Sequence, residues 1–185
     1  MSEAEATSAL SREPLPNPYT ISDVQGILGE RGCLISEAPD ERTAAWIAAG
    51  TAMLGPHAAD RATLGDLLGL CFEYDARNIM RAPATHTVLA REGARAVIRE
   101  LAFETIAGGP VDSDRFRAMI EAIKTRIPYR SRLLLHPIRL ALTGRAGEGE
   151  LDRVILLLDA ASGAAGLAPV KTVRQRILEF CAALD

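Results

Sequence analysis

Apolar residues recur at helical spacing along almost the whole chain, and this pattern constrains the fold more than any other feature. A helix brings residues three and four positions apart onto one face, whereas a strand alternates apolar and polar residues. The stretch from Phe116 to Ile123 follows the helical pattern, with Met119 and Ile120 between them. No convincing run of period-two alternation flanked by turn residues is present. The sequence therefore predicts an all-α fold, a helical bundle or cage.

Capping residues and helix breakers divide this pattern into segments. The expected helices lie at about 21–31, 41–54, 63 to Pro83, 88–106, from Asp112 onward, 150–160 and 170–184. Asp40 and Thr63 are the expected caps of the second and third helices, and Asp112-Ser113-Asp114 is expected to cap the fifth. Residues 130–136 are expected to be an extended connector, because Pro128 and Pro137 bracket them.

The length of 185 residues suits one well-buried domain or two small subdomains. Three prolines and few apolar residues predict a flexible tail over residues 1–19. The remainder is divided into two helical subdomains, 20–109 and 110–185, at the Gly108-Gly109-Pro110 break.

The run from Lys124 to Gly147 carries six basic side chains and no acidic one. Since the whole chain has a net charge of -3, the residues outside this run sum to -9. A basic surface on an otherwise acidic protein suggests an anionic ligand, of which RNA is the commonest large example. The alternative is a solvated charged face.

Within this run, Arg132-Leu133-Leu134-Leu135-His136-Pro137-Ile138-Arg139-Leu140-Ala141-Leu142-Thr143-Gly144 resembles the segment of bacterial glutamyl-tRNA synthetases that enters the last helices of their anticodon-binding region. The segments 151–158 and 170–184 are similar to the two closing helices of that region, and Arg61-Ala62-Thr63-Leu64-Gly65-Asp66-Leu67 is similar to an earlier helix start. The resemblance covers roughly residues 20–184, and the catalytic half of the family is missing.

The resemblance implies roles for three residues. Arg139 matches a position that contacts an anticodon base, since a guanidinium can both stack on a base and bind its edge. The alternative for Arg139 is an ion pair with a carboxylate of the bundle. Leu151 matches a position packed against the same base, although its helix also offers it a place in the core. Arg61 matches an arginine near the third anticodon position.

Further arginines are candidates for phosphate contacts that position RNA without reading its sequence. Arg130 and Arg132 are the first of these, and Arg145 of the same basic run joins the RNA-binding set. Arg174 and Arg176 could extend the footprint along the last helix. Glu148 and Glu150 place negative charge beside the expected RNA path, where the family commonly has Pro-Gly.

The chain lacks the chemistry of a synthetase. It has only two lysines, Lys124 and Lys171, far apart, and no Gly-rich phosphate loop, so no ATP site is expected. The three cysteines and three histidines have no ligand-like spacing, so no metal or other cofactor is expected. No apolar run approaches the length of a membrane span, and the acidic start does not resemble a targeting signal, so a cytoplasmic protein is expected.

We therefore expect a non-catalytic protein that binds the anticodon arm of a tRNA, alone or with a separately encoded synthetase catalytic chain. It would then serve protein biosynthesis by supplying specificity to an aminoacylation it cannot perform. The alternative is a protein-interaction or scaffold module that retains the helical fold after losing RNA. The acidic remainder of the chain favours this alternative.

Overall fold

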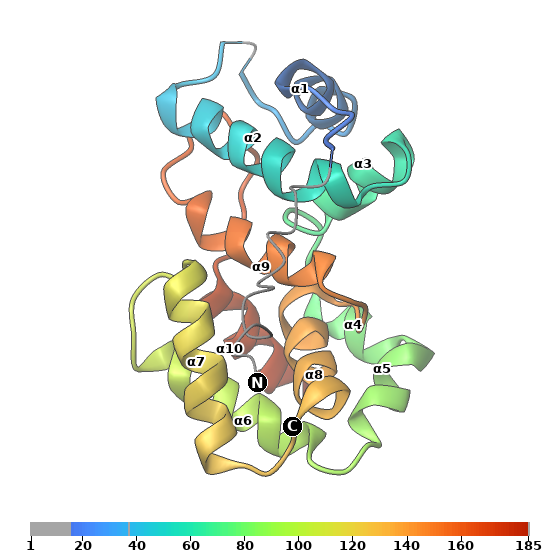
Figure 1. The fold of residues 1–185 in the computed structure, drawn as a ribbon, viewed down its shortest axis with the longest axis vertical. Coiled ribbons are helices and arrows are strands. Elements are labelled where there is room, and N and C mark those ends of the chain that lie inside the picture. The colour runs from blue at the N-terminus through green and yellow to red at the C-terminus, as the bar shows by residue number, and fades with distance from the viewer. Residues whose placement is uncertain (1–15, 37, 185) are drawn as a thin grey trace, which may run out of the picture.

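The all-α prediction is confirmed by the computed structural model, which describes residues 16–36 and 38–184 (Figure 1). The described residues form ten α-helices and one short 3-10 helix: α1 (Ile21–Glu30), α2 (Glu41–Leu54), η1 (Gly55–His57), α3 (Arg61–Gly69), α4 (Ala76–Arg81), α5 (Pro83–Leu89), α6 (Ala94–Ile106), α7 (Ser113–Arg126), α8 (Ser131–Thr143), α9 (Glu150–Ala160) and α10 (Val173–Leu184). The one β-type pairing among them is an isolated bridge between Leu34 and Leu167.

Side-chain caps begin several of these helices, and two of the caps are at aspartates where the sequence predicts them. The carboxylate of Asp40 accepts a hydrogen bond from the Thr43 amide, and that of Asp112 accepts one from the Arg115 amide, both at 2.8 Å. Each bond satisfies one of the first-turn amides that have no partner within the helix. The cap of α3 is Asp60 rather than Thr63, whose amide donates to the Asp60 carboxylate at 2.7 Å.

Helices α1, α2 and α3 pack together at one end of the molecule, and α9 crosses beneath them (Figure 1). The indole Nε1 of Trp46 on α2 donates to the backbone oxygen of Leu157 on α9 at 2.8 Å. The Trp46 ring also meets the Phe72 ring edge to face, with their centres 5.7 Å apart. The indole is therefore buried with its polar group satisfied.

The other half of the molecule is built around α6, which packs against α7, α8 and α10. Its buried stripe consists of Val97, Ile98 and Leu101. Helix α9 packs against α2 and α3 on one side and α8 and α10 on the other, so one hydrophobic core runs through both halves.

The packing does not follow the predicted subdomains. The boundary between residues 109 and 110 separates α6 from α7, which pack against each other, and α9 of the second predicted subdomain packs on α2 of the first. Of the predicted tail, residues 1–15 lie outside the described residues. In residues 16–19, the Asn17 side chain donates to the Thr51 backbone oxygen at 2.9 Å, which fixes this stretch against α2.

Three elements differ from the sequence-based expectation. Residues 131–143 form one helix, α8, with Pro137 inside it, so the predicted extended connector at 130–136 is wrong from residue 131 onward. A proline in a helix interior costs about 3 kcal/mol. Here the turns after Pro137 are buried throughout, and burial of Ile138, Leu140 and Leu142 offsets that cost.

The predicted helix at 88–106 is two helices, α5 and α6, separated at Gly93, which has φ 77°. The predicted helix from Thr63 to Pro83 is likewise divided. It ends at Gly69 and gives way to a loop containing Tyr74, after which Asp75 caps the separate helix α4.

Candidate nucleic-acid interface

Helix α8 carries a polar stripe along one side. Arg132, His136, Arg139 and Thr143 are spaced by four, three and four residues, which places them on one helical face. The opposite face is apolar and buried. The predicted RNA-binding residues belong largely to this helix and its ends. The hydrogen bonds and ion pairs that each of them makes within the protein therefore determine which side chains remain available to a ligand.

Arg139 is buried and paired. Its Nε and one terminal nitrogen donate to the two carboxylate oxygens of Asp152, each at 2.7 Å, and its other terminal nitrogen donates to the Gly147 oxygen at 2.8 Å. Hydrogen bonding to Asp152 raises the pKa of Arg139. The side chain of Arg139 is 6% exposed. This is the ion pair of the alternative interpretation, and contact with an RNA base would require Arg139 to leave Asp152.

Leu151 is the second residue of α9 and lies in the core together with Val154 and Ile155. Only 2% of its surface is exposed, so Leu151 occupies the core position, one of the two positions considered for it. Glu150 lies beside it at the start of α9, where a carboxylate interacts favourably with the helix dipole.

The arginines at the two ends of α8 remain at the surface. Arg132 in the first turn faces Glu148 with an N–O distance of 3.4 Å, and both side chains are mostly exposed, at 76% and 67%. Such a pair contributes little to stability. Arg145, just beyond the C-terminal end, is exposed and its guanidinium makes no hydrogen bond or ion pair with the described residues.

Arg130 precedes α8 and turns back onto α7. Its guanidinium donates to the backbone oxygens of Lys124, Ile127 and Tyr129 at 2.7 to 2.8 Å. A cation at this place satisfies carbonyls that the end of α7 leaves without partners. Arg130 therefore stabilises the turn between α7 and α8, and its side chain is already engaged.

Arg61 lies on α3, at the far end of the molecule from the start of α8 (Figure 1). It donates to the Glu30 carboxylate on α1 at 2.8 Å. The structure thus brings Arg130 and Arg132 together and leaves Arg61 apart from them.

Arg91 is a member of this surface that sequence reasoning missed. A terminal nitrogen of Arg91 lies 2.9 Å from Nδ1 of His136 on α8. Because arginine can only donate, His136 accepts at Nδ1 and is neutral, with its proton on Nε2. Burial, followed by the charge of Arg91, lowers the pKa of His136, which supports the neutral form. The sequence predicted one continuous helix over residues 88–106, so the loop between α5 and α6 that carries Arg91 was not expected.

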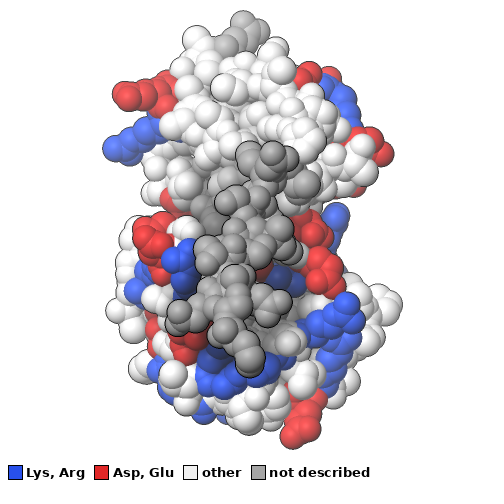
Figure 2. All heavy atoms as spheres, in the orientation of Figure 1, with Lys and Arg blue, Asp and Glu red and all other residues white. Residues whose placement is uncertain are grey.

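Lys and Arg side chains gather in the lower half of the face in Figure 2, and acidic side chains lie above this patch and at the lower edge of the molecule. In Figure 1 the chain enters α8 in this same half. This face thus carries a basic patch bordered by acidic side chains.

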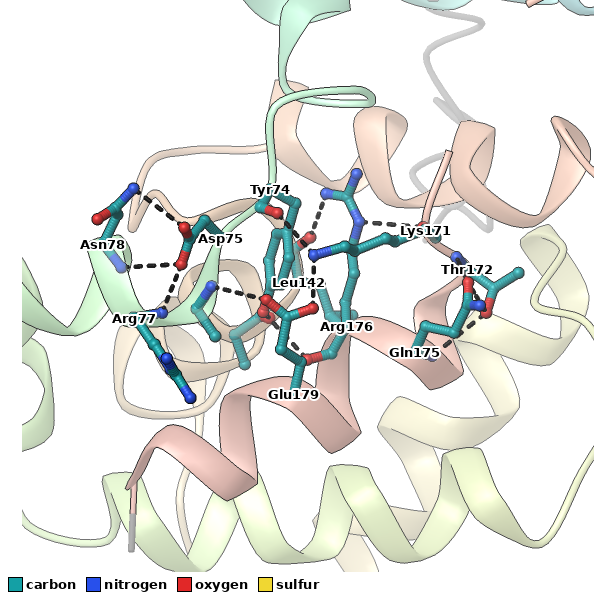
Figure 3. A network of polar contacts seen from close by, with 12 residues as sticks. Tyr74, Asp75, Arg77, Asn78, Leu142, Lys171, Thr172, Gln175, Arg176 and Glu179 are labelled. Carbon is teal, nitrogen blue, oxygen red and sulfur yellow. Dashed lines mark hydrogen bonds and ion pairs between the residues drawn. The ribbon is translucent and has the colours of Figure 1, made fainter. Parts of the chain in front are cut away.

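A second polar group lies inside the molecule, around Arg176 of α10 (Figure 3). Arg176 is fully buried, and its guanidinium donates to four backbone oxygens, those of Leu70, Cys71, Leu142 and Lys171, at 2.5 to 3.1 Å. Leu70 and Leu142 belong to the C-terminal ends of α3 and α8, where the helix dipoles favour a cation. Burial lowers the pKa of Arg176 to about 10, so it remains charged near neutral pH. Arg176 is therefore a structural residue and does not extend an RNA footprint, whereas Arg174, also considered for that role, is exposed.

Side chains around Arg176 complete this network. The Tyr74 hydroxyl donates to the Ala141 oxygen at 2.5 Å, and burial raises its pKa. Lys171 donates to Glu179 at 2.6 Å and to the Tyr74 oxygen at 3.0 Å (Figure 3). The network joins α3, α8 and α10, and most of its hydrogen bonds are accepted by backbone oxygens, as in a structural clamp.

The described residues contain no group of three or more His, Cys, Asp or Glu side chains that could hold a metal ion. Cys33 and Cys71 are buried thiols, and burial raises the pKa of Cys71 to about 12. Among the helices that the structure describes, none has the length and apolar character needed to cross a membrane.

Comparisons with protein-family models, with curated proteins and with solved structures find no match for this chain.

Proposed function

We propose that the protein binds RNA without catalysing a reaction, through contacts between phosphates and the arginines at the ends of α8. The observation that carries this proposal is the state of Arg132 and Arg145. Both are exposed in a stretch that contains no acidic residue, and among the described residues neither is held by more than a single long ion pair. Helix α8 rises about 20 Å over its 13 residues, which separates the two arginines by a span of several phosphates.

The class of RNA follows from the sequence resemblance, which points to the anticodon arm of a tRNA. The charge distribution supports contacts with the backbone rather than with bases. Arg139 is committed to Asp152, and a phosphate can compete for Arg132 more readily than for Arg139, because the Arg132–Glu148 pair is exposed and long. A separately encoded synthetase catalytic chain would be the natural partner for such a module.

A titration of a labelled anticodon stem-loop at several salt concentrations tests this proposal. Arg132→Gln and Arg145→Gln should each weaken binding of all stem-loops to a similar extent and reduce the slope of log affinity against log salt by about 1. Arg117→Gln is the matched control, because Arg117 is an exposed arginine near the start of α7 whose one ion pair, with Asp114, is also exposed.

Absence of stem-loop binding by the wild type at low salt would overturn the proposal. So would binding that is unchanged in the Arg132→Gln/Arg145→Gln double variant, once circular dichroism shows that this variant is folded. Either result would favour the interaction module over the RNA-binding module.

A further inference from the structure

Helices α6 and α10 lie side by side in antiparallel directions. Near the start of α6, the Arg95 guanidinium reaches the backbone oxygen of Leu184, close to the end of α10, at 3.5 Å. Near the end of α6, Thr105 lines the same hollow as Thr172 and Arg174 at the start of α10. The two helices therefore present a shared outer surface, here called the α6–α10 face, bounded by a hollow at each end.

The two hollows differ in volume but have similar linings. The one at the Arg95 end has a volume of ≈ 410 Å³ and is lined by Arg95, Ile98, Arg99, Cys181 and Leu184. The other has a volume of ≈ 290 Å³ and lies beside Arg174 and the Gly108-Gly109-Pro110 turn. Each hollow thus has an exposed arginine in its lining, together with an apolar side chain, Leu184 at one end and Pro110 at the other.

The surface between the hollows continues this combination. Leu178 lies four residues after Arg174 on the outward side of α10, and 45% of its surface is exposed. On α6, Arg95, Arg99 and Ile106 are spaced by four and seven residues and share one face, and Ile106 is also 45% exposed. Exposed leucine and isoleucine side chains next to arginines are typical of a protein-binding surface.

The charges of these two helices are segregated. Glu100 and Glu104 of α6 both pair with Arg126, so they face α7. Glu179 of α10 pairs with Lys171 and caps the start of α4. Asp159, which lines the hollow near Arg174, has both oxygens engaged by the backbone amides of Val111 and Val173. Each of these four carboxylates is thus already engaged by another group of the protein.

In contrast to these carboxylates, the arginines of the α6–α10 face have few polar partners among the described residues. Arg99 and Arg174 make no side-chain hydrogen bond or ion pair with the described residues, and Arg95 makes only its long contact with Leu184. Three arginines that have no carboxylate partner among the described residues thus surround an apolar centre. A ligand that fits must bring carboxylates to the edges and apolar groups to the middle.

We propose that the α6–α10 face docks an acidic amphipathic helix of a partner protein. The length of the face supports a helix, because Thr105 lies ten residues after Arg95, a rise of about 15 Å or nearly three helical turns. Apolar side chains one turn apart on the partner would reach the two hollows and Leu178, while glutamates or aspartates on both sides would meet Arg95, Arg99 and Arg174. This docking site is separate from the RNA contacts proposed at the ends of α8.

Two designed peptides of about fourteen residues test the proposal. The first has leucines at helical spacing and glutamates elsewhere, and the second has lysines in place of the glutamates. Because the whole protein has a net charge of -3, attraction without a defined site would favour the lysine peptide. We expect the glutamate peptide to bind about tenfold more tightly than the lysine peptide, as measured by fluorescence anisotropy.

The most informative variant replaces two arginines of the face with glutamates. Arg99→Glu/Arg174→Glu should reverse the order of the two peptides, and neither change removes a hydrogen bond or ion pair with the described residues. Leu178→Asp should weaken binding of the glutamate peptide about tenfold, and Leu133→Asp is its control, since Leu133 is comparably exposed, at 41%, but lies on α8. Melting curves establish that each variant is folded.

Equal binding of both peptides to the wild type, or no reversal in the charge-exchanged variant, would overturn the docking proposal. Displacement of the glutamate peptide by the stem-loop RNA, with that displacement lost in Arg99→Gln/Arg174→Gln, would also overturn it and assign the face to RNA. The RNA proposal stands or falls separately, on the Arg132 and Arg145 variants.

Discussion

The guanidinium carbon of Arg176 lies 4.6 Å from the centre of the Tyr74 ring, and the Tyr74 hydroxyl is directed at the Ala141 oxygen. The ring shields one side of the cation, and backbone oxygens surround its edge. A cation over an aromatic face is favourable, and more so away from water. The loop after α3 is thereby attached to α8 and α10 in the middle of the molecule.

Arg176→Met should destabilise the protein by about 2–4 kcal/mol, because it leaves several buried carbonyls at the ends of α3 and α8 without a donor. A hydrophobic replacement cannot compensate, since the partners belong to the backbone. Arg176→Lys should cost less, because an ammonium group still reaches some of these oxygens. Urea unfolding measures both, with Arg174→Met as the control that should change stability by less than about 0.5 kcal/mol. A loss in Arg174→Met as large as that in Arg176→Met would contradict this account.

The Arg139–Asp152 pair should show strong energetic coupling. Each single change, Arg139→Met or Asp152→Leu, leaves a mostly buried charge and should cost about 3–5 kcal/mol. The double variant should lose less than the sum of the two, with a coupling energy of about 1–3 kcal/mol. Chemical denaturation of all four proteins gives this cycle, and additive losses would show that the pair is not a unit. RNA binding by Arg139→Met must be interpreted together with this loss of stability.

His136 should make stability fall as the medium becomes mildly acidic. Its pKa is lowered in the folded protein, chiefly by burial, so the unfolded chain binds a proton more readily. Stability is therefore full above the unfolded pKa of about 6.5 and decreases as pH falls through the folded pKa. We expect the melting temperature to drop between about pH 7.5 and about pH 5, and to drop less in His136→Gln.

The control for this experiment is His86→Gln, a change at an exposed histidine of α5. His57 contributes in the same direction, because burial also lowers its pKa, so part of the pH dependence should survive in His136→Gln. The capping carboxylates Asp23, Asp40 and Asp60 have lowered pKa values and act only at more acidic pH. An identical pH dependence in wild type and His136→Gln would refute the assignment to His136.

Gly93→Ala should be destabilising by about 2 kcal/mol or more. Gly93 has φ 77°, where an L side chain is strained, and an added methyl group would meet the Tyr129 ring. Gly29→Ala is the opposite case, because Gly29 lies in α1 with open space around the added carbon, and it should gain about 0.5–1 kcal/mol of helix propensity. Thermal unfolding of both variants tests the contrast, which would fail if both changed stability in the same direction.

Local signals in the sequence were sufficient for helices that begin at an aspartate and end at a glycine or proline. Asp40 and Asp112 cap α2 and α7 as expected, because capping depends on a few neighbouring residues. The break at Gly93 also had a local signal, a glycine within an apolar pattern, but apolar spacing on both sides obscured it. Helix α8 could not be found this way, since tolerance of Pro137 depends on long-range burial.

The candidate site shows the same limit. The basic residues of α8 could be identified from the sequence, but neither the helical face that they share nor their partners could. Asp152 lies 13 residues from Arg139, and Arg91 lies 45 residues from His136. Arg174 and Arg176, two residues apart, differ completely in exposure because α10 has one side in the core.

The hydrogen bond from Trp46 to Leu157 equips the protein with an optical reporter. The sequence has a single tryptophan, and its indole joins α2 to α9, the helix shared by both halves of the core. The tryptophan fluorescence therefore reports on the interface between α2 and α9 rather than on an average over several tryptophan sites. If the α1–α3 layer separated from α9 while the helices around α6 stayed packed, the fluorescence of Trp46 would change before the far-ultraviolet circular dichroism did.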